Sequence, residues 1–179
     1  MNIIKHICLK NKLELMISKA SLNDAENIVP FLNQIGGETD FLTFGLNEFP
    51  LSISEEKEMI ATCINSNQYL IAVGKIDQAI VSQLFIDRSN QPRLSHIGHL
   101  GVSVSKQYWQ QGIGKHMILF ALDWAKLSGV TKLNLDVRTD HHAALNLYKN
   151  LGFHIEGHIS RAIKINETYF DNYQMGMNI

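Results

Sequence analysis

The chain has 179 residues, of which 45% are hydrophobic and 18% charged, and it carries a formal net charge of −1. This length and composition predict one globular domain with a full core and argue against two domains. The near-neutral charge provides no general attraction for nucleic acid, and no apolar run reaches the ~20 residues that cross a bilayer. We therefore expect neither nucleic acid nor a membrane as a partner.

The first twelve residues do not read as a secretion signal. They place three lysines around short apolar stretches, and they contain neither a long apolar region nor a small-residue cleavage site. The two cysteines, Cys8 and Cys63, lie far apart and lack the spacing of a metal or redox pair, which is typical of a reducing compartment. We expect a cytoplasmic protein with a frayed leader over residues 1–12 and a single domain over residues 13–179.

The first half of the domain is predicted to contain a strand, two helices and three further strands. The first helix can be capped by Ser21 or Asn23, and it ends at the pair Gly36-Gly37. The second helix begins at Ser54, where a hydroxyl is followed by acids, and runs to about residue 65. The expected strands are residues 13–19, 69–73, 79–87 and 94–104, the last three as an antiparallel meander.

Between the two helices, residues 38–51 have no clean period and are predicted to form an irregular loop. The loop carries three aromatic side chains together with the acids Glu38, Asp40 and Glu48. These carboxylates have the charge to recognise a cationic amine as substrate. The alternative is that they form a solvated face of the loop.

After residue 104 the pattern changes to a glycine turn, a helix, a strand, a short helix and a hairpin. The segment Tyr108-Trp109-Gln110-Gln111-Gly112-Ile113-Gly114-Lys115 leads directly into an amphipathic helix that ends at Gly129. Glycines allow a ligand to approach the backbone, and the first helical turn leaves amide N–H groups free, so this turn predicts a phosphate site. The remaining expected elements are a strand at 133–137, a helix at about 141–151 and strands at about 154–165 and 167–177.

The spacing of the glycine turn excludes two common nucleotide sites. A P-loop needs a hydroxyl residue after Gly114-Lys115, and His116 stands there. A dinucleotide fingerprint needs a third glycine at the position of Met117. Taken alone, the glycine pair is also compatible with an ordinary tight turn.

Two blocks of sequence together resemble the GNAT superfamily of acetyl-coenzyme A dependent N-acetyltransferases. Trp109, Gly112 and Gly114 lie on the marked positions of its motif A, Arg/Gln-x-x-Gly-x-Gly/Ala, with Trp109 in place of the arginine or glutamine. The second block is similar to motif B, Asn-x-x-Ala-x-x-Leu-Tyr-x-x-x-Gly-Phe, with His141 in place of the asparagine. The matching residues of the second block are Ala144, Leu147, Tyr148, Gly152 and Phe153.

The resemblance implies the GNAT fold, an α/β (α+β) arrangement. We expect a mixed, mostly antiparallel, twisted sheet of six to seven strands with helices on both faces. Its central strands, which carry Val102 and Leu135, start side by side and splay apart in that family, and the pantetheine arm of coenzyme A fills the gap. Backbone groups near Leu100, Val102 and Val104 would then lack a strand partner and bind that arm.

The resemblance also implies a reaction, the transfer of an acetyl group from acetyl-coenzyme A, a co-substrate, to a primary amine within a ternary complex. Tyr148 is the expected acid that protonates the departing thiolate; its helix pattern alone favours a packing residue, and the resemblance to the family reverses that interpretation. His99 is the expected base; the alternatives are a structural histidine and a water chain that ends on one of the loop carboxylates. The expected cofactor-binding residues are Leu100, Val102, Val104, Trp109, Gln110, Gln111, Gly112, Ile113, Gly114, Lys115, His141, Asn146 and Lys149.

The identity of the acceptor amine stays open at this level. The resemblance points to small polyamines or antibiotics, or to protein N-termini, and it is compatible with a homodimer. We expect no metal, because the histidine pairs His141-His142 and His154/His158 lack the spacing of ligands on a helix. The alternative function is a degenerate domain that binds coenzyme A as a sensor without transferring an acetyl group.

Overall fold

The computed structural model describes residues 4–179, which form one eight-stranded sheet and four α-helices. The strands are β1 (Ile4–Cys8), β2 (Glu14–Lys19), β3 (Tyr69–Ile76), β4 (Ala79–Arg88), β5 (Ile97–Val104), β6 (Lys132–Arg138), β7 (His154–Ile165) and β8 (Thr168–Asn178). The helices are α1 (Ala25–Gly36), α2 (Ile53–Asn65), α3 (Ile113–Ser128) and α4 (His142–Asn150).

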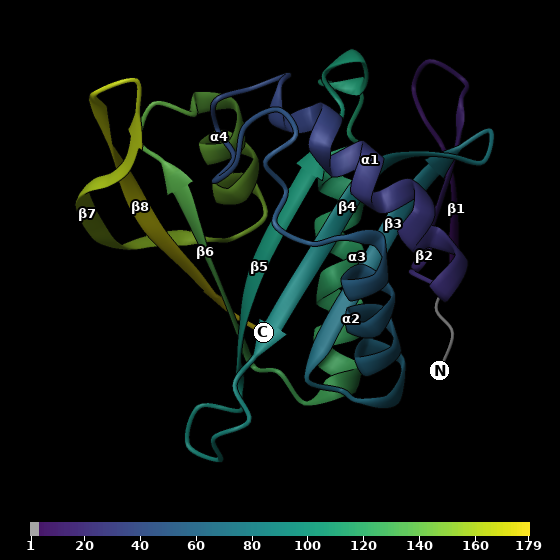
Figure 1. Cartoon of the computed structure of the whole chain (residues 1–179). Helices are drawn as coiled ribbons and strands as arrows, with labels where there is room; N and C mark the ends of the chain where they lie inside the picture. The colour runs from purple at the N-terminus through teal and green to yellow at the C-terminus, as the bar shows by residue number, and fades with distance from the viewer. Residues whose placement is uncertain (1–3) are drawn as a thin grey trace.

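The sheet has the order β1-β2-β3-β4-β5-β6-β8-β7 (Figure 1). Every neighbouring pair is antiparallel except β5 and β6, which run parallel. The expectation of a mixed, mostly antiparallel sheet is therefore confirmed. The expected number of six to seven strands was too low.

The extra strand comes from the N-terminal residues. β1 pairs with β2 along its whole length, from Ile4 opposite Ser18 to Cys8 opposite Glu14, and Leu9 is buried in the core. The expectation of a frayed leader is thus wrong for residues 4–12, while residues 1–3 lie outside the described residues. The edge of β2 offers unpaired backbone groups, and a short segment without a clean period can satisfy them by adding a strand.

Helices cover both faces of the sheet, as expected. α1 and α2 lie on one face, in front of β3 and β4 in Figure 1, and α3 lies behind the sheet. The side of α3 that packs on the sheet contains seven buried residues, among them Met117, Phe120 and Trp124. This face of the sheet, together with α4, encloses the larger of two hydrophobic cores, and α1 and α2 enclose the other.

The start of α2 differs from the expectation by two residues. Ser52, rather than Ser54, is the capping residue: its hydroxyl accepts a hydrogen bond from the amide of Glu55, and the Glu55 carboxylate accepts one from the amide of Ser52. A serine followed three residues later by glutamate forms a reciprocal capping box, which Ser54 cannot form with Lys57.

The separation of β5 and β6 is confirmed. Their pairing covers only Ile97–His99 against Lys132–Asn134, whereas β5 continues to Val104 and β6 to Arg138. Figure 1 shows the two strands close together at their starts and apart at their ends. Within residues 4–179, no helix is long and apolar enough to span a membrane.

Candidate active site

The side of β5 that faces the gap can be worked out from hydrogen bonds at its two ends. Before the strand, the carbonyl of His96 accepts from the amide of Lys132, which lies on the β6 side. After it, the amide of Ser105 donates to the carbonyl of Val81 on the β4 side. The backbone N–H and C=O groups of successive residues in a strand point to opposite edges. In β5, those of the even-numbered residues therefore point toward β6. The expected gap residues Leu100, Val102 and Val104 are all even-numbered. Their backbone groups therefore point into the gap where β6 has moved away.

Trp109, the residue that departs from motif A, lies at the end of this gap. Its indole Nε1 donates a hydrogen bond of 2.7 Å to the carbonyl of Val104. A backbone carbonyl left without a strand partner is costly when it is removed from water, and the indole supplies the missing donor. The substitution of tryptophan for arginine or glutamine therefore has a structural role here.

The glycine turn that follows has the geometry of an anion site. Gly112 caps α3 with a φ of +88°, which favours glycine. The first bond within the helix runs from the amide of His116 to the carbonyl of Gly112, so the amides of Ile113, Gly114 and Lys115 precede the helical pattern. Because Gly112 has no side chain to cap them, these amides and the positive end of the helix dipole are available to a phosphate.

Gly114 brings the two sequence blocks together. A Cβ atom at this position would lie 3.3 Å from Cδ2 of Leu147 on α4, which is closer than a comfortable contact. The glycine therefore permits the first turn of α3 to approach the residue next to Tyr148. Motif A and motif B, which are separated by about thirty residues in sequence, therefore meet at this contact.

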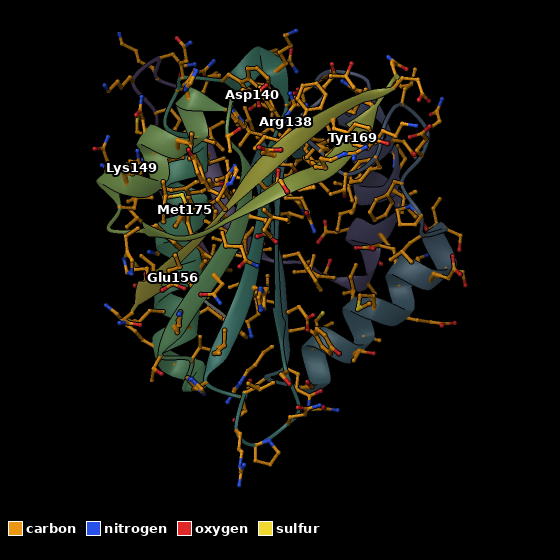
Figure 2. The ribbon with its side chains drawn as sticks, turned by 90° about the vertical axis from the view of Figure 1, so that its left-hand side faces the viewer. Arg138, Asp140, Lys149, Glu156, Tyr169 and Met175 are labelled. Carbon is orange, nitrogen blue, oxygen red and sulfur yellow. The ribbon has the colours of Figure 1, made fainter. Side chains whose placement is uncertain are left out.

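The remaining expected cofactor residues are divided between engaged and free side chains. Gln111 is engaged, since its side chain accepts from Asn11 in the β1–β2 turn and donates to the carbonyl of Gln107. The side chains of Gln110, Lys115, Asn146 and Lys149 are exposed, and Lys149 lies on the outer side of α4 in Figure 2. Asn11 is a contributor to the site that the sequence did not indicate.

Tyr148 is buried beside the gap. Only 9% of it is exposed, and its ring meets the ring of Phe153 edge-on at 5.8 Å between centroids. Burial raises the pKa of the Tyr148 hydroxyl to about 12. The group therefore holds its proton near neutral pH, as a general acid must.

His99 lies on the opposite face of the sheet. Its neighbour Leu100 points into the core that contains Tyr148, and successive side chains of a strand point to opposite faces. The exposed His99 ring lines a small hollow of about 40 Å³ together with Asn134, Asp136 and Glu156. The Oδ1 atom of Asn134 is buried without a hydrogen-bond partner, so this hollow offers an unused acceptor. The expected acid and base thus flank the gap from opposite faces.

The three expected substrate carboxylates do not form one group. Glu38 is engaged at the end of β5, where its Oε2 accepts from the amide of Lys106 at 2.6 Å. Asp40 and Glu48 line a second hollow, of about 270 Å³, between the α1–α2 loop and the tip of the β7–β8 hairpin. Glu48 also accepts a hydrogen bond from the amide of Gly45 at 2.8 Å. The structure therefore brings together only two of the three expected acids, Asp40 and Glu48, and it places them around this hollow.

His141 and Arg138 connect that loop to the start of α4. The ring of His141 stacks on Phe41 with 3.8 Å between centroids, and burial lowers its pKa, with the Asp140 carboxylate acting in the opposite direction. Arg138 is only 6% exposed at the end of β6, beside Asp140 (Figure 2). The sequence did not single out Arg138, because all its partners other than Asp140 come from segments far away along the chain.

Comparisons with known proteins agree with this geometry. The model of the acetyltransferase (GNAT) family matches residues 40–153. L-amino acid N-acetyltransferase AaaT of Escherichia coli (strain K12) is 32% identical over 107 residues, which are 58% of this chain and 64% of that enzyme. The [ribosomal protein bS18]-alanine N-acetyltransferase of the same strain is 29% identical over 49% of this chain and 53% of its own length. The chain thus spans less than two thirds of the length of these relatives.

Solved structures extend the similarity to nearly the whole chain. An acetyltransferase of the GNAT family from Streptococcus pneumoniae has a TM-score of 0.90 and 33% sequence identity, covering 93% of this chain and 100% of its own. YncA, a putative acetyltransferase from Salmonella typhimurium solved with its cofactor acetyl-CoA, has a TM-score of 0.79 at 14% identity, over 92% of this chain and 93% of its own. At that identity, the second likeness shows the fold alone.

Proposed function

The chain belongs to the GNAT family of acetyltransferases, and on this premise we propose that it transfers an acetyl group from acetyl-coenzyme A to a primary amine. The observation that carries the proposal is the separation of β5 and β6 beside the uncapped start of α3. A strand edge without a partner suits an amide-bearing ligand arm, and free helical amides suit a diphosphate. Coenzyme A combines both features in one molecule.

In this proposal the cofactor is held mainly by backbone groups. The amides of Ile113, Gly114 and Lys115 hold the diphosphate, and the gap-facing groups of Leu100 and Val102 replace strand hydrogen bonds with bonds to the pantetheine arm. The exposed Asn146 and Lys149 on α4 add polar contacts from the other side. The arm then runs toward the buried hydroxyl of Tyr148.

The chemistry needs a base on one side of the gap and an acid on the other. An alkylamine with a pKa of ~10.4 must lose a proton before it can attack, which costs roughly 4 kcal/mol near neutral pH. His99 accepts this proton, directly or through water, from the face that holds the acceptor. The neutral amine attacks the thioester carbonyl, and the C–N bond forms in a tetrahedral intermediate whose oxyanion is stabilised by an amide near Val102. The C–S bond then breaks, the Tyr148 hydroxyl gives its proton to the departing thiolate, and the second proton of the amine nitrogen restores that hydroxyl.

The acceptor enters, in this proposal, through the hollow lined by Asp40 and Glu48. The names of the two relatives above point to a free L-amino acid or a protein N-terminus as acceptor, and small polyamines are a third class. All three present a cationic amine that carboxylates can attract. A cytoplasmic location and a homodimer are part of the same proposal, and Cys8 and Cys63 are both free thiols.

The test combines turnover with binding. The purified chain is given acetyl-coenzyme A and a panel of L-amino acids, a peptide that starts with alanine, and spermidine, and release of the coenzyme A thiol is followed. We expect turnover of at least one amine and protection of the amides of residues 111–115 from hydrogen exchange by acetyl-coenzyme A. Binding without turnover of any amine would favour the sensor alternative. A titration without heat or amide protection would overturn the proposal.

A further inference from the structure

Residues 38–41, which follow α1, contact both of the strands that splay apart. We refer to these four residues as the strap. In Figure 1 the segment between α1 and α2 runs across the upper part of the molecule, between α1 and α4. The contacts at the two ends of the strap differ in chemistry, and each involves a side chain that is largely withdrawn from solvent.

One end of the strap is attached to the end of β5. The Glu38 carboxylate accepts from the amide of Lys106 at 2.6 Å and from the hydroxyl of Ser105 at 3.4 Å. Ser105 directly follows β5 and is only 3% exposed. The side-chain amide of Gln34, on α1, donates to the same carboxylate at 2.8 Å and so fixes its position.

The other end of the strap is attached to the end of β6. The guanidinium of Arg138 forms a fork with the Asp140 carboxylate, with distances of 3.0 and 2.6 Å, and its remaining nitrogen donates to the carbonyl of Asp40 at 2.9 Å. The same guanidinium lies 4.9 Å from the ring centroid of Phe41 and 3.6 Å from that of Phe170 on β8. Only arginine combines a planar fork for a carboxylate with stacking on aromatic faces.

The strap therefore crosses the wide end of the gap. β5 and β6 stop pairing at His99 and Asn134, and the two attachment points, Ser105 and Arg138, lie several residues beyond. Two strands that no longer bond to each other are thus connected through the strap. Thr39 and Asp40 also line the 270 Å³ hollow, so the element that bridges the strands is at the same time a wall of that hollow.

From these contacts we infer that Arg138 is a positioning residue, which holds the strap and thereby shapes the acceptor pocket. This inference rests on the proposed function, because it takes the hollow as the entrance of the amine. Arg138 does not touch the reacting atoms. It acts through Asp40 and Phe41, and Glu38 performs the corresponding role at the other end. Loss of either attachment frees the same four residues.

The test uses Arg138→Met and Glu38→Ala, with Arg138→Lys as the conservative variant. The matched control is Arg88→Met. Arg88 is also an arginine at a strand end whose guanidinium donates to backbone carbonyls, those of Ser95 and Ser128, but it lies beside the start of β5 rather than its end. For each variant we measure KM for the panel amine with the highest wild-type turnover, the Kd of acetyl-coenzyme A, and hydrogen exchange of residues 38–48.

We expect Arg138→Met and Glu38→Ala each to raise the amine KM about tenfold, since a displaced wall misplaces the substrate. Hydrogen exchange of residues 38–48 should accelerate, and the Kd of acetyl-coenzyme A should change by less than about twofold. Arg138→Lys should give values between those of the wild type and those of Arg138→Met. The double variant should show less than the product of the single effects, because one loss already frees the strap. Arg88→Met should change neither the amine KM nor this exchange.

Unchanged KM and unchanged exchange in folded Arg138→Met and Glu38→Ala would overturn the inference, and so would an equal response from Arg88→Met. If Arg138→Met does not fold, Glu38→Ala and Arg138→Lys carry the test. If the wild-type chain acetylates no amine of the panel, the proposed function fails, and the exchange measurement alone decides whether Arg138 holds the strap.

Discussion

The proposed cofactor side and the proposed acceptor side of this molecule are built in different ways. The cofactor side consists of backbone amides at the start of α3, a helix with seven buried residues, and of the free edge of β5. The acceptor side consists of the loop 38–51, which contains no helix or strand and is attached by side chains. Backbone in a packed core can move little, whereas a loop held by a few polar contacts can be changed by single substitutions. The difference predicts which variants affect cofactor binding, turnover or acceptor recognition.

The largest expected effect separates chemistry from cofactor binding. Tyr148→Phe keeps the ring against Phe153 and removes only the hydroxyl, whose raised pKa keeps it protonated. We expect kcat to fall about 100-fold, since general acid catalysis contributes at least that much. The Kd of acetyl-coenzyme A, measured by calorimetry, should stay within about twofold, because the cofactor is held elsewhere. An unchanged kcat would show that Tyr148 is a packing residue.

A second substitution tests whether the cofactor side depends on the close approach of α3 and α4. Gly114→Val introduces a branched side chain where Leu147 is already within 3.3 Å of a Cβ position. Overpacking of this kind costs about 1–3 kcal/mol, so we expect acetyl-coenzyme A to bind roughly tenfold more weakly. Leu127→Val, at an exposed position near the end of the same helix, is the matched control and should bind normally. Equal affinities in both variants would contradict the prediction.

Trp109→Phe tests a side-chain contact on the otherwise backbone-built cofactor side. The variant keeps an aromatic ring but removes the N–H donor to the Val104 carbonyl. One hydrogen bond contributes about 1 kcal/mol net, so we expect the Kd of acetyl-coenzyme A to rise about fivefold. Hydrogen exchange should also become faster in residues 104–109. If neither changes, the indole does not order the end of the gap.

The smallest expected effect concerns the helical layer next to the acceptor loop. Glu56 on α2 is 2% exposed, its Oε1 has no hydrogen-bond partner, and burial raises the pKa of its carboxyl above the ordinary value of 4.5. Because the folded state holds this proton more tightly than the unfolded state, stability declines as pH rises from about 4.5 through the raised pKa. Glu56→Gln should therefore increase the free energy of unfolding by about 1 kcal/mol at neutral pH and flatten that decline. Thermal unfolding at several pH values measures both, and a variant as pH-sensitive as the wild type would contradict the prediction.

The same division separates what the sequence could predict from what it could not. Gly112 and Gly114 were located correctly because a glycine turn before an amphipathic helix is a local signal, and the resemblance to a family supplied the separation of β5 and β6. The role of Tyr148 stays a prediction from its motif position; the structure shows the side chain buried in the core that also contains Leu100. The cap of α2 was placed two residues late because both Ser52 and Ser54 precede acids, and only Ser52 has a glutamate three residues later.

The acceptor side could not be predicted in this way. Glu38 was expected to meet substrate but binds the amide of Lys106, and Arg138 was not noticed at all, although it is buried among residues of three segments. Neither contact leaves a pattern in the neighbouring sequence, because the partners are brought together only by the topology of the sheet. Asn134 and Asp136 are an intermediate case: their alternation with Leu133 and Leu135 indicates a polar face, but not the hollow that it lines.

The hydrogen bond between Asn11 and Gln111 has a practical consequence for work on this domain. A shortened version that begins at residue 13 would retain both motifs, yet it would lose the strand β1 and the Asn11 amide that donates to Gln111 in the glycine turn proposed to bind phosphate. The family match begins only at residue 40, so similarity alone would not warn against such trimming. Residues 4–12 should therefore be kept, and bulky additions to the start of the chain kept short, whenever acetyl-coenzyme A affinity is to be measured.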